Sequence, residues 1–238
     1  MKKIIGMNPI IEALDSGKSF EKIEIYTGIK KESIKKLLKI ASTNNIKINY
    51  TNKRFDNSQG IVGYLLEYDY YTTLEAFLEK ELIHDESLIV ILDQIQDPGN
   101  FGAIIRSCEC FGVRGIIIQD RNNVKVTETV IKSSAGAIEH MDIVQVVNIS
   151  DTIDKLKKYG YFVYAAAGEG DKQYDKIEYA KKKVLVVGNE GNGIRKKVRE
   201  HSDMIVKIPL LGKINSLNVS VATGIFLAKM QEEQNEVK

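Results

Sequence analysis

Three short stretches of the chain combine turn residues with polar side chains that are able to bind a ligand. In the first, "LDQIQDPGNFGAIIRS" (92–107), a Pro98–Gly99 turn leads into a helical pattern that carries Asn100 and Arg106. Asn100 stands where a helix N-cap is expected, and Arg106 could be an ordinary solvated helix arginine. Each could equally present an amide or a guanidinium to a polar ligand, so this stretch alone identifies no site.

The second stretch, "VLVVGNEGNGIRKK" (184–197), places Gly188, Gly191 and Gly193 directly after an apolar run. Glycines allow positive φ angles and a close approach of the backbone to a ligand. Their spacing is neither GxGxxG nor GxxxxGK[ST], so it supports neither a dinucleotide-binding fold nor a P-loop. Glu190 lies inside this turn, where a carboxylate could serve a site or simply face solvent.

The third stretch, "KINSLNVSVATG" (213–224), begins a helical pattern with more hydrogen-bonding capacity than a helix start needs. One side chain is enough to cap a helix, yet Asn215, Ser216, Asn218 and Ser220 all fall near its first turn. Ser216 could be the cap. We interpret the surplus as part of a ligand site.

Neither metal nor disulfide chemistry is expected. Cys108 and Cys110 are two residues apart within a helical pattern, so their side chains point to different faces and cannot pair. His84, His140 and His201 are scattered without the spacing of metal ligands.

The elements that must position these side chains alternate between apolar runs and helical patterns over residues 87–238. Such continuous Val/Ile/Leu runs, separated by helices, predict an α/β fold with a mostly parallel sheet covered on both faces. Ligands of such sheets bind beyond the carboxyl ends of the strands, which is where the three stretches fall. The predicted strands are 88–93, 115–119, 143–147, 161–167, 184–188 and 204–208.

A smaller α/β unit is expected over residues 1–72, where strand patterns at 22–26 and 46–50 flank a helical pattern at 33–41. The acidic amphipathic stretch 73–86 is predicted to be a linker, and 87–238 the second domain. A length of 238 residues suits two domains.

No apolar run approaches the roughly 20 residues of a membrane span. The basic start is interrupted by Gly6, Asn8 and Pro9. This pattern does not resemble a signal peptide, so a cytoplasmic protein is expected.

The net charge of +2 conceals a basic segment between residues 30 and 54, where eight basic residues accompany one acid, Glu32. A basic face of this density could bind nucleic-acid phosphates. It could equally be the solvated surface of a lysine-rich protein. The candidate contacts to RNA are Lys35, Lys36, Lys39, Lys53 and Arg54.

Taken together, "NFGAIIRS" (100–107), "VGNEGNGI" (187–194) and "IPLLGKINSLNVSVATG" (208–224) resemble the three motifs of the SpoU (TrmH-like) family of RNA ribose methyltransferases, within the SPOUT superfamily. "GMNPIIEAL" (6–14) and "SQGIVGYL" (58–65) resemble the ends of the L30e-type RNA-binding domain of members that modify ribosomal RNA. Ser58 departs from the histidine that the family often has there.

The resemblance implies a trefoil knot in the second domain, S-adenosylmethionine as cofactor, and a homodimer whose active site draws on both chains. The final helix, 216–230, is a candidate dimer interface, although its apolar stripe could equally be core. The cofactor contacts implied by the resemblance are Gly188, Gly191, Ile208 and Leu217. The implied catalytic positions are Asn100, Arg106, Glu190, Ser216 and Asn218.

Arg106 is the residue that the family is thought to need. A guanidinium stays protonated, so a free-base role is physically awkward. Stabilising charge on the attacking oxygen, or binding the adjacent phosphate, suits it better. The expected reaction is methylation of a ribose 2′-hydroxyl, with a guanosine of 23S ribosomal RNA as the leading substrate. A tRNA ribose methyltransferase of the same family, or an RNA-binding protein without catalysis, are the alternatives.

Overall fold

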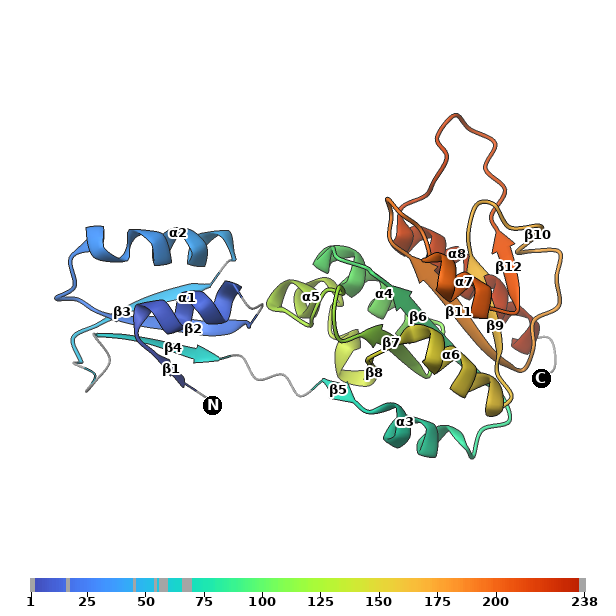
Figure 1. The fold of residues 1–238 in the computed structure, drawn as a ribbon, viewed down its shortest axis with the longest axis horizontal. Coiled ribbons are helices and arrows are strands. Elements are labelled where there is room, and N and C mark those ends of the chain that lie inside the picture. The colour runs from blue at the N-terminus through green and yellow to red at the C-terminus, as the bar shows by residue number, and fades with distance from the viewer. Residues whose placement is uncertain are drawn as a thin grey trace. The chain divides into compact units, whose positions relative to one another are not determined.

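The computed structural model describes residues 3–15, 18–44, 46–53, 55, 60–65 and 70–235, with side chains of the last helix described as far as residue 232. The chain divides into two compact units, Met1–Asp69 and Tyr70–Lys238. Each unit is described by itself (Figure 1).

The first unit has a four-stranded sheet in the order β1-β4-β2-β3. β2 and β3 are parallel, and β4 is antiparallel to both β1 and β2. Right-handed crossovers that advance in one direction along a sheet place their helices on one face, and both helices indeed pack on the same core. The elements are β1 (Lys3–Ile5), α1 (Met7–Asp15), β2 (Phe20–Tyr26), η1 (Lys31–Ile34), α2 (Lys35–Thr43), β3 (Lys47–Thr51) and β4 (Ile61–Leu65).

Alternation along the sequence accounts for this core. Ile23 and Ile25 of β2 face the helices and are fully buried, since side chains two apart in a strand share a face. Leu37 and Ala41, one helical turn apart in α2, are buried against them. The lysines of α2 consequently lie on its exposed side.

The second unit has an eight-stranded sheet in the order β10-β12-β9-β11-β6-β7-β8-β5, whose described pairings are all parallel. This confirms the predicted α/β fold with a mostly parallel sheet. Its elements are β5 (Tyr71–Thr72), α3 (Leu74–Glu81), β6 (Ser87–Asp93), α4 (Pro98–Cys110), β7 (Gly115–Gln119), α5 (Glu128–Ser133), η2 (Ala137–His140), β8 (Asp142–Val146), α6 (Ile149–Lys158), β9 (Phe162–Ala166), β10 (Lys172–Gln173), β11 (Lys182–Gly188), α7 (Lys196–His201), β12 (Met204–Lys207) and α8 (Val219–Asn235).

Helices cover both faces of this sheet, so its central strands are buried throughout. Every residue of β6 is buried. Ile89 and Ile91 pack in the core that includes α3 and α6, whereas Val90 and Leu92 are buried on the opposite face. On that face α4 contacts α5 and α8. The continuous apolar runs in the sequence reflect this double burial.

Residues 73–86, predicted to be a linker, instead pack within the second unit. β5 pairs with β8, and Leu74, Phe77 and Leu78 of α3 belong to the main core. The boundary therefore falls at Asp69/Tyr70 rather than after residue 72. Besides its acidic residues, α3 has an apolar stripe at the i, i+3, i+4 spacing of a packed helix, and the prediction of a linker overlooked this stripe.

The two cysteines lie on different faces of α4, as predicted, with Cys108 buried and Cys110 exposed. Among the described residues, no group of three or more His, Cys, Asp or Glu is arranged to hold a metal ion. The described helices include none long and apolar enough to span a membrane.

Candidate active site at the carboxyl ends of the strands

A cavity of about 370 Å³ lies beyond the carboxyl ends of β9, β11 and β12. Its walls come from the segments that follow those strands and from the start of α8, and the long loop 208–218 stands out beyond the sheet (Figure 1). Cavities of roughly 300–1,000 Å³ are typical of sites for small molecules and cofactors. A cavity therefore lies where the sequence predicts a ligand site.

Glycines shape the loop after β11 for reasons internal to the protein. A Cβ on Gly188 would overlap the backbone of Gly193, which itself has a φ of +64°. The backbones of Asn189 and Gly193 bond to each other in both directions, at 3.1 and 2.8 Å. The side chain of Asn189 accepts from the Gly191 N–H at 2.9 Å. The loop is therefore a compact turn whose glycines permit its own packing.

An ion pair between a buried carboxylate and a partly exposed arginine anchors this loop to the centre of the sheet. Asp93, at the end of β6, is fully buried, and its carboxylate accepts from both the backbone N–H and Nε of Arg195 at 2.8 Å. Arg195 Nη2 in turn donates to Gln119 Oε1, at the end of β7, at 2.9 Å. The start of α7, and with it one wall of the cavity, is fixed to two neighbouring strands.

Three polar side chains, one from each of the predicted stretches, contact one another beside the cavity, and of these Glu190 lines it. Asn100 Nδ2 donates to Glu190 Oε1. Asn218 Nδ2 donates to Asn100 Oδ1 at 2.9 Å. Asn100 thus lies between Glu190 and Asn218, and both polar atoms of its amide are used. We refer to these three residues as the polar triad.

The helix caps differ from the two that the sequence suggested. The N-cap of α4 is Asp97, whose carboxylate accepts from the Asn100 N–H at 2.7 Å, so the Asn100 side chain is left for the polar triad. Asn218, rather than Ser216, caps α8, and its Oδ1 accepts from the Ser220 N–H at 2.9 Å. Asn, Asp and Ser side chains can all cap a helix, so the sequence does not show which of them stands at the residue where the helix begins.

Of the other predicted residues in this unit, five line the cavity and Arg106 does not. Ser216, Gly188, Gly191, Ile208 and Leu217 all line the cavity.

Arg106 lies apart from the polar triad. It is exposed on α4, six residues after Asn100, and the two side chains are therefore separated by about 120° around the helix axis. Within the part of the chain that the structure describes, its side chain forms no hydrogen bond or ion pair. Among the described residues of a single chain, Arg106 therefore makes no such contact with the polar triad.

Sequence reasoning missed two pairs of residues at this site. Glu169 and Arg199 form an ion pair and both line the cavity. A signal for Glu169 existed, because it stands between two glycines just after the strand pattern at 161–167. Asp93 and Arg195 gave no comparable signal, since their contact spans 102 positions of the chain.

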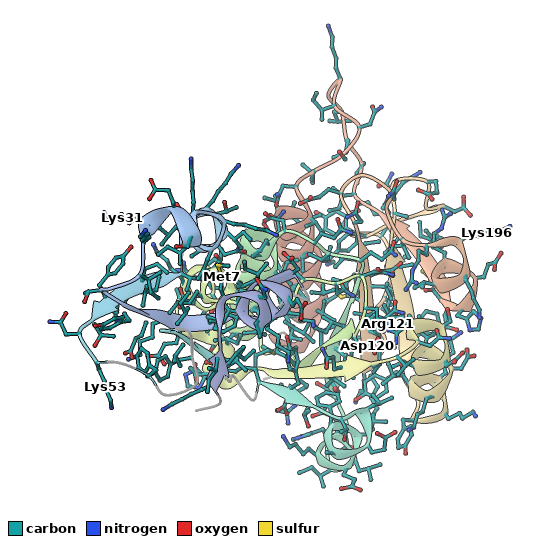
Figure 2. The ribbon with its side chains drawn as sticks, turned by 60° about the vertical axis from the view of Figure 1, so that its left-hand side comes forward. Met7, Lys31, Lys53, Asp120, Arg121 and Lys196 are labelled. Atoms are coloured by element: carbon teal, nitrogen blue, oxygen red, sulfur yellow. The ribbon has the colours of Figure 1, made fainter. Side chains whose placement is uncertain are left out.

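The candidate RNA contacts lie on the first unit. Lys35, Lys36 and Lys39 are exposed along α2, and Lys53 is exposed after β3. Figure 2 shows Lys31 and Lys53 projecting from this unit. Arg54 lies outside the described residues, as does Ser58, where the sequence departs from the family pattern.

Comparison with known proteins gives matches over both units. The model of the SpoU rRNA methylase family matches residues 87–228, and that of the RNA 2′-O ribose methyltransferase substrate-binding domain matches residues 3–71. A Staphylococcus saprophyticus protein, named as a TrmH family tRNA/rRNA methyltransferase, is 34% identical over 98% of this chain and 96% of its own length.

Two solved structures are similar in fold as well as sequence. The AdoMet-bound rRNA methyltransferase from Sinorhizobium meliloti is 26% identical, with a TM-score of 0.60, and the match covers 97% of this chain and 87% of that one. The TrmH/SpoU tRNA modifying enzyme of A. aeolicus is 29% identical with a TM-score of 0.58, covering 67% of this chain and 85% of that one.

Proposed function

Because this chain belongs to the SpoU rRNA methylase family, we propose that it transfers a methyl group from S-adenosylmethionine to a ribose 2′-hydroxyl of RNA. We propose a guanosine of 23S ribosomal RNA as the target. The observation that carries this proposal is the polar triad beside a cavity at the carboxyl ends of the strands. Such a site is suited to placing a hydroxyl against a bound cofactor.

The cavity fits S-adenosylmethionine in size and in the chemistry of its walls. Ile208, Leu217 and Phe226 offer apolar surface for the adenine, and the turn at Gly188 and Gly191 brings backbone groups to the cavity. The S. meliloti relative was crystallised with this cofactor. When bound, S-adenosylmethionine supplies a methyl group on a positively charged sulfur.

The polar triad would orient the attacking hydroxyl. Asn100 is held on both sides, so it fixes the carboxylate of Glu190 against rotation. The second carboxylate oxygen of Glu190 can accept the hydrogen bond of a ribose hydroxyl, which directs the lone pair of that hydroxyl toward the methyl group. Ser216, on the cavity wall, is placed to contact the same ribose.

Arg106 would stabilise the negative charge that develops on the attacking oxygen, or bind the neighbouring phosphate. Because it lies apart from the polar triad of its own chain, we propose that Arg106 acts on the site of a second copy in a homodimer. One active site would then use residues of two chains.

An apolar surface around the start of α8 supports the homodimer. Leu211 and Ile214 are highly exposed in the loop, and Leu217 and Val221 remain 36% and 52% exposed. The opposite side of α8, including Phe226, is buried within the unit. A helix that is apolar on both sides is typical of one that also packs against a partner.

The exposed lysines of α2 would bind phosphates of the RNA. Changing Lys35, Lys36 and Lys39 to glutamate should weaken RNA binding and flatten its dependence on salt. Binding that is unchanged, with the same salt dependence, would show that this stripe faces only solvent.

Ribosomal RNA is favoured over tRNA by how much of the chain each relative matches. The S. meliloti rRNA methyltransferase matches 97% of this chain and so includes the first unit. The tRNA modifying enzyme of A. aeolicus matches 67%. Mapping the methylated nucleotide in total RNA from a strain that lacks the gene, with and without complementation, would distinguish the two substrates.

A further inference from the structure

One face of the sheet in the first unit is left uncovered by both of the unit's helices. Ile23 of β2 faces the core with α1 and α2. The residues before and after it therefore project from the opposite face, since strand side chains alternate. We refer to this opposite side of the sheet as the open face.

A row of four residues crosses the open face, one on each strand. Lys3 of β1 pairs with Tyr64 of β4, Tyr64 pairs with Lys22 of β2, and Lys22 pairs with Lys47 of β3. Residues that are partners across strands share a face. The row thus places a tyrosine among three lysines.

Contacts along this row hold the tyrosine in a fixed orientation. The ammonium groups of Lys22 and Lys3 lie 4.6 and 5.2 Å from the centre of the Tyr64 ring. The Tyr64 hydroxyl donates to Glu24 Oε2 at 2.9 Å, and Lys22 Nζ donates to Glu24 Oε1 at 2.7 Å. The hydrogen bond from Lys22 holds the pKa of Glu24 below its ordinary value, so this anchor stays ionised.

The chemistry of the row is complementary to unpaired nucleotides. Aromatic rings presented on a sheet stack against bases, and ammonium groups around them bind the phosphates. Glu24 offsets one of the three lysine charges, which leaves the row with a positive balance. A stacked base can replace an exposed ammonium on one face of the ring, because stacking is the stronger of the two interactions.

We propose that the open face binds unpaired nucleotides of the RNA substrate, with a base stacked on Tyr64 and phosphates held by Lys3 and Lys47. This inference rests on the proposed function and adds a second RNA contact to the α2 lysines. The two surfaces differ in chemistry, because the α2 stripe offers charge without an aromatic ring. Only the open face would therefore select unpaired bases over duplex.

The absence of tryptophan from the chain provides a direct assay. Tyr64→Trp introduces a single tryptophan on the open face, and Tyr50→Trp introduces one on the helix side. Tyr50 is a suitable control because it pairs with the buried Ile25, so it faces the other way, and it is 51% exposed. Adding hexa-adenylate RNA to the full chain should quench the emission at position 64 and leave that at position 50 unchanged.

Binding measurements complete the test. Tyr64→Ala should weaken binding of the same RNA by about five- to a hundredfold, as expected for the loss of one stacked base. Tyr64→Phe, which keeps the ring, should retain most of the affinity. Tyr50→Ala should bind like the unaltered chain.

Equal quenching at both positions, no quenching at position 64, or full affinity in Tyr64→Ala would overturn the inference. A concentration-dependent change at position 64 without RNA would also overturn it, because it would show that a second copy covers this face. Methyl transfer to ribosomal RNA by the unaltered chain is measured in parallel. Its absence contradicts the proposed function, whereas its presence with an unaffected Tyr64→Ala variant contradicts this inference alone.

Discussion

Replacing Arg195 with methionine should destabilise the second unit by about 3–5 kcal/mol, because it leaves a buried carboxylate without its cation. Asp93 has no exposed side-chain surface, whereas the side chain of Arg195 is 37% exposed. Among the described residues, the Asp93 carboxylate of Arg195→Met then keeps only the hydrogen bond from the backbone N–H of residue 195.

The reverse change should cost less. In Asp93→Asn the shape of the side chain is kept, and the Arg195 guanidinium, already partly exposed, can be hydrated. The loss is then closer to that of hydrogen bonds to a charged group, about 1.5–3 kcal/mol. The structure thus predicts an asymmetry between two variants that break the same ion pair.

Hydrogen exchange of the backbone amides in β6 and β11 reports the stability of this unit without interference from the first unit. Both variants should exchange faster than the unaltered protein, with Arg195→Met the faster of the two. The affinity for S-adenosylmethionine should also fall in both, since the pair anchors a wall of the cavity. Equal protection in the two variants, or less protection in Asp93→Asn, would contradict the predicted asymmetry.

Three further predictions concern cysteines, alkaline pH and the dimer. In the native protein a thiol reagent should modify Cys110 alone, because Cys108 is buried and burial raises the pKa of its thiol; both should react after denaturation. Burial raises the pKa of Tyr161 from 10.0 to about 12, so its contribution to stability is complete below pH 10 and is lost as the pH rises through about 12. Tyr161→Phe should reduce this alkaline loss in equilibrium unfolding, and an unchanged pH profile would contradict the assignment. If the proposed homodimer forms and each site uses Arg106 from one protomer and Glu190 from the other, mixing and re-forming the inactive Arg106→Ala and Glu190→Ala variants should restore about a quarter of the activity; no recovery would mean that both act within one chain.

The strands and the place of the site could be predicted because their signals are local. β6, β7 and β11 are continuous apolar runs, and such runs identify buried parallel strands. Asn100, Glu190 and Asn218 follow strand ends, so the geometry of a parallel sheet was enough to expect them at one edge.

Contacts that depend on register or on distant pairing could not be predicted in this way. The row Lys3–Tyr64–Lys22 requires the alignment of three strands, which no local pattern in the sequence specifies. The prediction that residues 73–86 form a linker was wrong because the apolar stripe of α3 is buried against the sheet. The sequence of α3 alone does not show what this stripe packs against. Arg106 is recognisable by its place in a motif, but the structure of one chain does not show the group on which we propose that it acts.

The decisive measurement is the transfer of a labelled methyl group from S-adenosylmethionine to unmodified 23S ribosomal RNA. After complete digestion to nucleosides, the label should be found on the ribose of a guanosine, and Glu190→Gln should reduce its incorporation. Label found only on a base, or no transfer to RNA by the unaltered protein, would contradict the proposed function.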